Sequence, residues 1–81
     1  MRYFGAAKAA SGTAEERLAA GRTLADVLVE LKGRPGIPDA PSLPKVLGRS
    51  SFLLNEVALR DETVVLQDHD VLDILPPFAG G

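Results

Sequence analysis

The chain ends with Val71-Leu72-Asp73-Ile74-Leu75-Pro76-Pro77-Phe78-Ala79-Gly80-Gly81, an apolar run followed by two prolines and a diglycine. The apolar run predicts a final strand. The two prolines remove backbone donors and favour extended backbone, so we expect them to end sheet pairing and project the remaining residues away from the domain. Because glycine has no Cβ, the diglycine can enter a channel too narrow for any side chain.

The α-carboxylate of Gly81 is the group that such a tail would deliver into another protein's active site. It is inert until activated, for example as an acyl-adenylate, from which a sulfur or nitrogen nucleophile can displace AMP. A fully extended chain from Phe78 to Gly81 reaches roughly 13 Å, enough to enter a neighbouring site while Phe78 stays at its rim. The alternative interpretation is that the two glycines are only a disordered chain end.

Composition narrows the class of protein. The 81 residues form one domain with a modest core, too small for a deep enclosed active site. Nine basic and eleven acidic residues give a net charge of −2 without a basic cluster, which argues against a nucleic-acid partner. The absence of cysteine excludes disulfides, thiolate metal sites and a cysteine nucleophile. No signal peptide or membrane-spanning run is present, so we expect a soluble, cytoplasmic protein.

Periodicity predicts a small α+β domain with a helix on one face of a mixed sheet. The clearest helix covers residues 23–32, where Leu24, Val27, Leu28 and Leu31 share one face, with Thr23 and Asp26 at its start and Gly33 at its end. Helical propensity also favours a helix over residues 14–20, whereas the prolines of residues 34–44 predict a surface loop. We also predict strands at residues 2–4 and 71–75 and helices at residues 6–10 and 42–47. Ser42 would cap the second of these helices and Gly48 would end it. A hairpin is predicted from strands at residues 51–54 and 57–59, with its turn at residues 55–56.

Strand alternation predicts an apolar patch beside the tail. In the last strand, Leu72 and Ile74 face one way, and Asp73 with Leu75 faces the other. The charge of Asp73 marks its face as the solvent side, so Leu75 is expected to be exposed. The same pattern in the first strand places Phe4 with Arg2. If the first and last strands are neighbours, Phe4, Leu75 and Phe78 form one patch for docking a partner, unless the first helix or the proline loop covers them.

No self-contained catalytic apparatus is apparent in the sequence. His69, the single histidine, lies between two aspartates in a turn and is expected to be a solvated turn residue rather than a metal ligand or a base. We expect no metal site. The glycines near residue 34 lack the lysine and the helix of a phosphate-binding loop.

Several segments together resemble the small subunit of molybdopterin synthase, the MoaD type of ubiquitin-like sulfur carrier in the MoaD/ThiS superfamily. The likeness covers essentially the whole chain, and its specific part is the acidic turn, strand, Pro-Pro and Gly-Gly of residues 70–81. The weaker segments are Arg2-Tyr3-Phe4-Gly5-Ala6-Ala7, Thr23-Leu24-Ala25-Asp26-Val27-Leu28 and Asn55. His69 departs from the family, which commonly has glycine at that turn position.

The resemblance implies a ubiquitin-like β-grasp fold over residues 1–75, with residues 15–19 as the second strand of a hairpin, and an extended tail over residues 76–81. It also implies that Gly81 is adenylated and then converted to a thiocarboxylate, whose sulfur builds the dithiolene of molybdopterin. The chain would then be a non-catalytic subunit of a heterotetrameric synthase. The chemistry implied by the resemblance falls on Gly81 alone. From strand alternation and the extended tail, we expect the partner-binding residues to be Phe4, Leu75, Pro76, Pro77, Phe78, Ala79 and Gly80.

The partners implied by the resemblance are the large synthase subunit, a ubiquitin-activating-type adenylyltransferase that uses ATP, and a sulfur donor protein. No cofactor would be bound permanently. Three alternatives remain open: a carrier for thiazole or cysteine synthesis, a protein modifier joined to lysines through Gly81, and an interaction-only ubiquitin-like domain.

Overall fold

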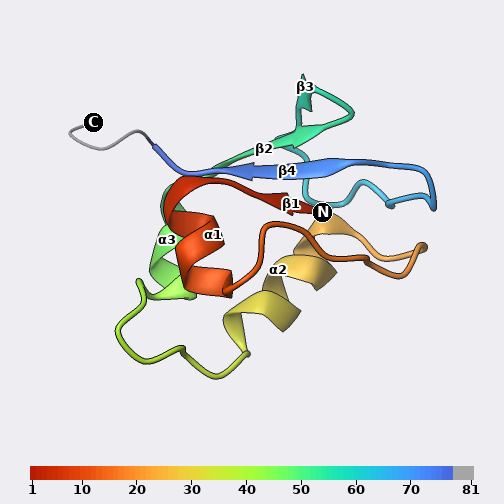
Figure 1. The fold of residues 1–81 in the computed structure, drawn as a ribbon. Coiled ribbons are helices and arrows are strands. Elements are labelled where there is room, and N and C mark those ends of the chain that lie inside the picture. The colour runs from red at the N-terminus through yellow and green to blue at the C-terminus, as the bar shows by residue number, and fades with distance from the viewer. Residues whose placement is uncertain (78–81) are drawn as a thin grey trace.

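The computed structural model describes residues 1–77 of the chain. Within them, a sheet forms one layer and helices form the other (Figure 1). The elements, in chain order, are β1 (Arg2–Tyr3), α1 (Gly5–Ser11), α2 (Leu24–Lys32), α3 (Leu43–Arg49), β2 (Ser51–Leu54), β3 (Val57–Ala58) and β4 (Leu72–Leu75).

The sheet has the strand order β1-β4-β2-β3, so the last strand lies inside it. β4 pairs in parallel with β1, with Arg2 opposite Asp73, and antiparallel with β2, with Leu53 opposite Asp73. The first and last strands are therefore neighbours, as the patch hypothesis required. The mixed sheet with its helices confirms the predicted α+β class.

Helix α2 forms as its sequence predicts. Thr23 and Asp26 make a reciprocal capping box, in which each backbone N–H donates to the other residue's side chain at 3.1 Å. The four predicted apolar positions are all buried, and Gly33 is the C-cap. Each end of this helix is thus determined by local sequence, and its apolar face is determined by spacing.

The segment between α1 and α2 is where propensity fails. Residues 14–19 form no helix; instead Tyr3 N donates to Ala14 O at 2.8 Å and Glu16 N donates to Met1 O at 2.9 Å. This backbone pairs antiparallel with β1, but only through one isolated bridge between Arg2 and Glu15. The second hairpin strand that the resemblance implied at residues 15–19 is therefore not formed as a strand, and α1 lies between the two paired segments. The open edge of β1 offers this segment backbone hydrogen bonds in an extended conformation, so tertiary pairing overrides the helical preference.

Helix α1 ends at a position where glycine is required. Gly12 is its C-cap with φ 79°, and a Cβ there would lie 2.8 Å from Cδ1 of Ile37. The proline loop therefore packs against the end of α1. Helix α3 differs from its prediction: Gly48 lies inside the helix, which continues to Arg49, and the Ser42 side chain makes no cap hydrogen bond. The packing of buried Leu43 and Leu47 carries the helix through the glycine, whose Cβ position is open space.

The β2–β3 hairpin turns as predicted at Asn55 and Glu56, whose φ angles of 51° and 71° are both left-handed. Two left-handed central residues make the tight loop whose twist matches that of paired strands. The Asn55 side chain also binds the turn before β4, because Nδ2 donates to Asp70 Oδ1 and Val71 N donates to Asn55 Oδ1, both at 2.9 Å.

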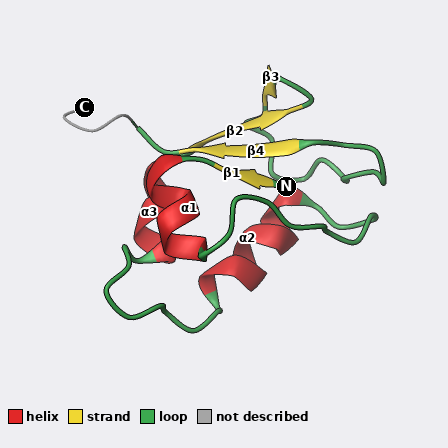
Figure 2. Ribbon diagram, viewed as in Figure 1, coloured by secondary structure: helices red, strands yellow, loops and turns green. Residues whose placement is uncertain are grey.

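The core lies between the sheet and the helices, all three of which lie on the same side of the sheet (Figure 2). From the sheet, Tyr3, Leu72 and Ile74 point into it and are almost fully buried. Leu66, in the connection before β4, is buried with them and donates its N–H to Arg22 O at 2.8 Å. None of the helices formed within residues 1–77 combines the length and the apolar character that crossing a bilayer requires.

Candidate functional site: the open sheet face at the base of the tail

The helices cover one face of the sheet and leave the other face open (Figure 2). Strand residues that alternate away from the core face this open side. On β1 and the residue after it these are Arg2 and Phe4, and on β4 they are Asp73 and Leu75. We call these four residues the open-face cluster. Phe4 and Leu75 lie at the end of the sheet from which the chain leaves β4, and the paired Arg2 and Asp73 lie two residues before them.

The apolar members of the open-face cluster are accessible to different degrees. Phe4 is 40% exposed, as strand alternation predicted. Leu75 is half-buried, less exposed than that alternation predicted, because its strand has neighbours on both sides. Pro76 is also half-buried and Pro77 is exposed. The predicted contributors Phe78, Ala79, Gly80 and Gly81 lie outside the described residues.

The expectation that Asp73 faces solvent is wrong, since only 4% of it is exposed. Its carboxylate is covered by Arg2, which donates from Nε to Oδ1 at 2.6 Å and from Nη2 to Oδ2 at 2.7 Å. This side-on bidentate pair lets a charged residue sit in the central strand. The ion pair could have been predicted from the opposite charges at matching positions of the first and last strands. That prediction requires knowing that the two strands pair in parallel.

Arg2 is held from two directions. Besides Asp73, the ring of Phe4 lies under the guanidinium, with its centroid 5.7 Å from Cζ. The hydrogen bond and the charge of Asp73 raise the pKa of Arg2. The side chain nevertheless remains 43% exposed, so the open-face cluster presents a fixed guanidinium edge beside apolar surface.

The tail begins where β4 stops pairing. Leu75 is the last residue of the strand, opposite Ser51, and Pro76 and Pro77 follow without strand structure. In Figure 1 the chain runs off the sheet at this point, next to the start of α1. The predicted role of the prolines as a strand stop is therefore met, since β4 ends at Leu75 and Pro76 and Pro77 follow it outside the sheet.

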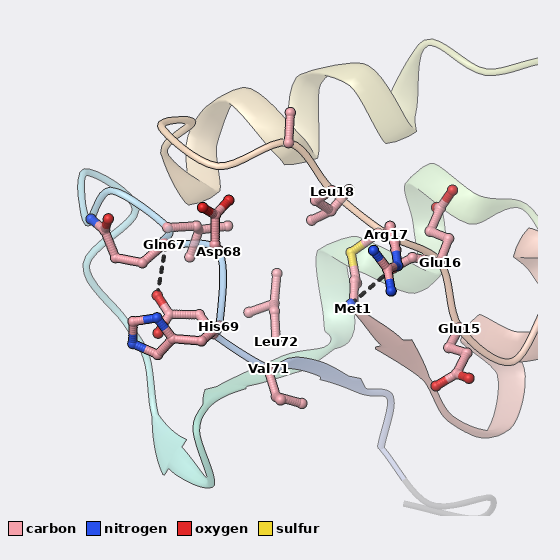
Figure 3. Close-up of a pocket in the computed structure, with 13 residues that line it drawn as sticks. Met1, Glu15, Glu16, Arg17, Leu18, Gln67, Asp68, His69, Val71 and Leu72 are labelled. Atoms are coloured by element: carbon pink, nitrogen blue, oxygen red, sulfur yellow. Dashed lines mark hydrogen bonds between the residues drawn. The ribbon is translucent and has the colours of Figure 1, made fainter.

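A depression of about 790 Å³ lies elsewhere, at the start of β4 (Figure 3). Its rim includes Arg17, Leu18, Gln67 and His69. His69 is an exposed turn residue, as predicted, and among residues 1–77 no three potential metal-ligating side chains come together. Being at the other end of the strand from Leu75, this hollow is separate from the base of the tail.

The fold defines the class of domain: a ubiquitin-like β-grasp domain whose last strand leads to the C-terminal segment. The ThiS family matches residues 1–81. Among solved structures, a chain of the "Protein-protein complex of subunit 1 and 2 of Molybdopterin-converting factor from Helicobacter pylori 26695" is similar to this one, with a TM-score of 0.65 and 27% identity over 99% of this chain and 93% of that chain. No curated protein sequence gives a significant match.

Because the family match spans the whole chain, the chain belongs to the ThiS family, in the MoaD/ThiS superfamily of sulfur carriers. The predicted β-grasp fold and the predicted family are both confirmed.

Proposed function

We propose that this chain carries sulfur as a Gly81 thiocarboxylate and donates it, as the small subunit of molybdopterin synthase, to a pyranopterin precursor. The observation that carries the proposal is full-length similarity to a chain from the complex of the two molybdopterin-converting factor subunits. The position of β4 supports it, because a carrier needs its tail to leave from a strand that the domain holds firmly.

The chemistry proposed for Gly81 needs three participants. Its carboxylate attacks the α-phosphate of ATP on a ubiquitin-activating-type adenylyltransferase, forming the acyl-adenylate and releasing pyrophosphate. A sulfur nucleophile, at the oxidation level of sulfide, then attacks the acyl carbon. The C–O bond to AMP breaks, AMP leaves, and the thiocarboxylate remains. When that sulfur passes to the pterin, water attacks the acyl carbon, the C–S bond breaks, and Gly81 returns to a carboxylate. Two such transfers supply the two sulfur atoms of the dithiolene.

In this scheme residues 1–75 are the domain that partners recognise and residues 76–81 are the tail. The open-face cluster lies at the junction, so a large synthase subunit that receives the tail would cover Phe4 and Leu75. Small exposed apolar surfaces beside a reactive terminus suit such docking. The catalytic side chains belong to the partners.

Intact mass spectrometry tests the proposal. Incubation with ATP, adenylyltransferase and a sulfide source is expected to raise the mass by about 16 Da, one oxygen being replaced by sulfur, and to make this cysteine-free chain reactive toward a thiol alkylator. Adding the large subunit and the pterin precursor should then return the original mass and yield a dithiolene product.

The same experiment separates the alternatives. Thiocarboxylate that is discharged only by thiazole or cysteine synthesis enzymes would identify a carrier for those pathways. Isopeptide adducts on lysines would identify a protein modifier. A chain that never gains mass with a competent activating system would contradict sulfur carriage altogether.

A further inference from the structure

The Arg2–Asp73 pair gives the open-face cluster a polar centre. Asp73 uses both oxygens on Arg2, and Arg2 uses only Nε and one N–H of Nη2. The other guanidinium N–H groups, including both on Nη1, have no acceptor among residues 1–77. Because the side chain is 43% exposed, these donors are accessible from the open side of the sheet.

These donors are also fixed in direction. The bidentate pair holds the guanidinium plane and the Phe4 ring supports it from below, so little conformational freedom remains for a partner to remove. A partner that covers Phe4 and Leu75 also covers this edge. Donors buried without an acceptor would oppose association, so the covering surface must supply one.

The charges around Arg2 distinguish the kind of acceptor. Asp73 already neutralises the guanidinium, and Glu15, paired with Arg2 across the isolated bridge, is exposed beside it. Glu56, in the hairpin turn, adds a second exposed carboxylate that contributes to the field at Arg2. One carboxylate is therefore paired with the guanidinium and two more add negative potential at it, which disfavours a further carboxylate on the partner.

We infer that Arg2 is a specificity-determining residue of the docking surface, and that its partner presents a neutral hydrogen-bond acceptor, a backbone carbonyl or a side-chain amide, set in apolar surface. The inference rests on the proposed function for the identity of the partner, the large synthase subunit. It adds that apolar contact alone does not suffice, because a partner without the acceptor would leave the Arg2 donors unsatisfied.

The decisive variant removes both charges together. In Arg2→Met/Asp73→Leu, apolar side chains replace the pair, a change that proteins often tolerate without loss of stability. If the partner used only apolar area, this double variant would bind as well as the wild type or better. If the partner's acceptor pairs with Arg2, the acceptor is left buried and unsatisfied, and Kd for the large subunit should rise about tenfold or more.

Binding is measured by titration calorimetry with the full-length chain and the large subunit, at low and high salt, after thermal melting has verified that the double variant folds. Glu15→Gln is the matched charge control. With a neutral acceptor, Glu15→Gln should change Kd less than about twofold, and the ratio of double-variant to wild-type Kd should not depend on salt. Tighter binding of Glu15→Gln at low salt would reveal a partner carboxylate and overturn the neutral-acceptor assignment.

The remaining outcomes are also decisive. Unchanged or tighter binding by the double variant, with normal wild-type affinity, overturns the inference and leaves the proposed function standing. If the wild type does not bind the large subunit, the same titrations are made against the adenylyltransferase. A tenfold loss there supports the Arg2 inference while the synthase role fails. Binding to neither protein contradicts both.

Discussion

Arg34 donates from Nη1 to Oε1 of Glu16 at 2.8 Å, joining the loop after α2 to the segment that pairs with β1. The same carboxylate accepts the hydroxyl of the buried Tyr3. Burial raises the pKa of Glu16, but the hydrogen bonds from Arg34 and Tyr3 outweigh it, so the net effect is a lowered pKa. Burial, and then the bond to Glu16, raises the pKa of Tyr3.

The first prediction follows from the sign of the Glu16 shift. A pKa that is lower in the folded state than its ordinary 4.5 gives stability that is complete above that value and disappears as pH falls through the folded pKa. Wild type should therefore exceed Glu16→Gln in stability at pH 7, and the difference should shrink below about pH 4.5. Urea denaturation of both proteins from pH 7 to pH 3 measures it. A constant difference across that range would show that ionisation of Glu16 contributes nothing.

The second prediction concerns the asymmetry of the Arg2–Asp73 pair. Arg2→Met leaves an unpaired carboxylate in a site only 4% exposed, whereas Asp73→Asn leaves a guanidinium that can still reach water. We expect Asp73→Asn to lower Tm by roughly 4–8 °C, and Arg2→Met to lower Tm by more than that. Calorimetric melting of both variants tests this, and the reverse order would mean that Asp73 is solvated.

The third prediction separates backbone strain from side-chain bonding at Asn55. Asn55→Gly keeps the left-handed φ but loses the bonds to Asp70 and Val71, and Asn55→Ala loses both features. We expect the alanine variant to be less stable than the glycine variant by about 1 kcal/mol. Equal stabilities in chemical denaturation would show that the φ angle is not what selects asparagine.

The fourth prediction distinguishes docking from core packing at Leu75. This side chain is half-buried on the open face, so Leu75→Glu should destabilise the domain only modestly, by about 1 kcal/mol, and should weaken binding of the large subunit by about 2 kcal/mol or more. The matched control is Val29→Glu, on the outer side of α2 at 73% exposure, which should affect neither property. A large loss of stability with unchanged affinity would make Leu75 a core residue.

The fifth prediction addresses the tail. Gly80→Leu adds a side chain where the proposed channel admits only backbone, so sulfur transfer should fail while Tm stays unchanged. Single-turnover transfer and thermal melting together test it. Normal transfer by the variant would refute the narrow-channel argument.

Much of this fold is visible in the sequence because its signals are local. The capping box of α2, the hairpin turn at Asn55 and the strand stop at Pro76 are each encoded within a few residues. The predictions that were wrong concern contacts between residues far apart in the chain. Residues 14–19 are extended because β1 offers them an edge, and Asp73 is buried because Arg2 reaches it from a strand 71 residues earlier in the chain. In the candidate site, strand alternation predicted the exposure of Phe4 but not the Arg2–Asp73 ion pair, because that pair depends on which distant strands are neighbours.

The central position of β4 has a mechanical consequence. A partner that draws the tail inward pulls on Pro76, and the load passes along β4 itself, between β1 on one side and β2 on the other. The inter-strand hydrogen bonds lie across this direction, so they resist as a group in shear instead of opening one after another like a zipper. A strand at the sheet edge would have half as many ladders to share the force. The domain is therefore suited to withstand a pulling force applied at its C-terminal end without unfolding.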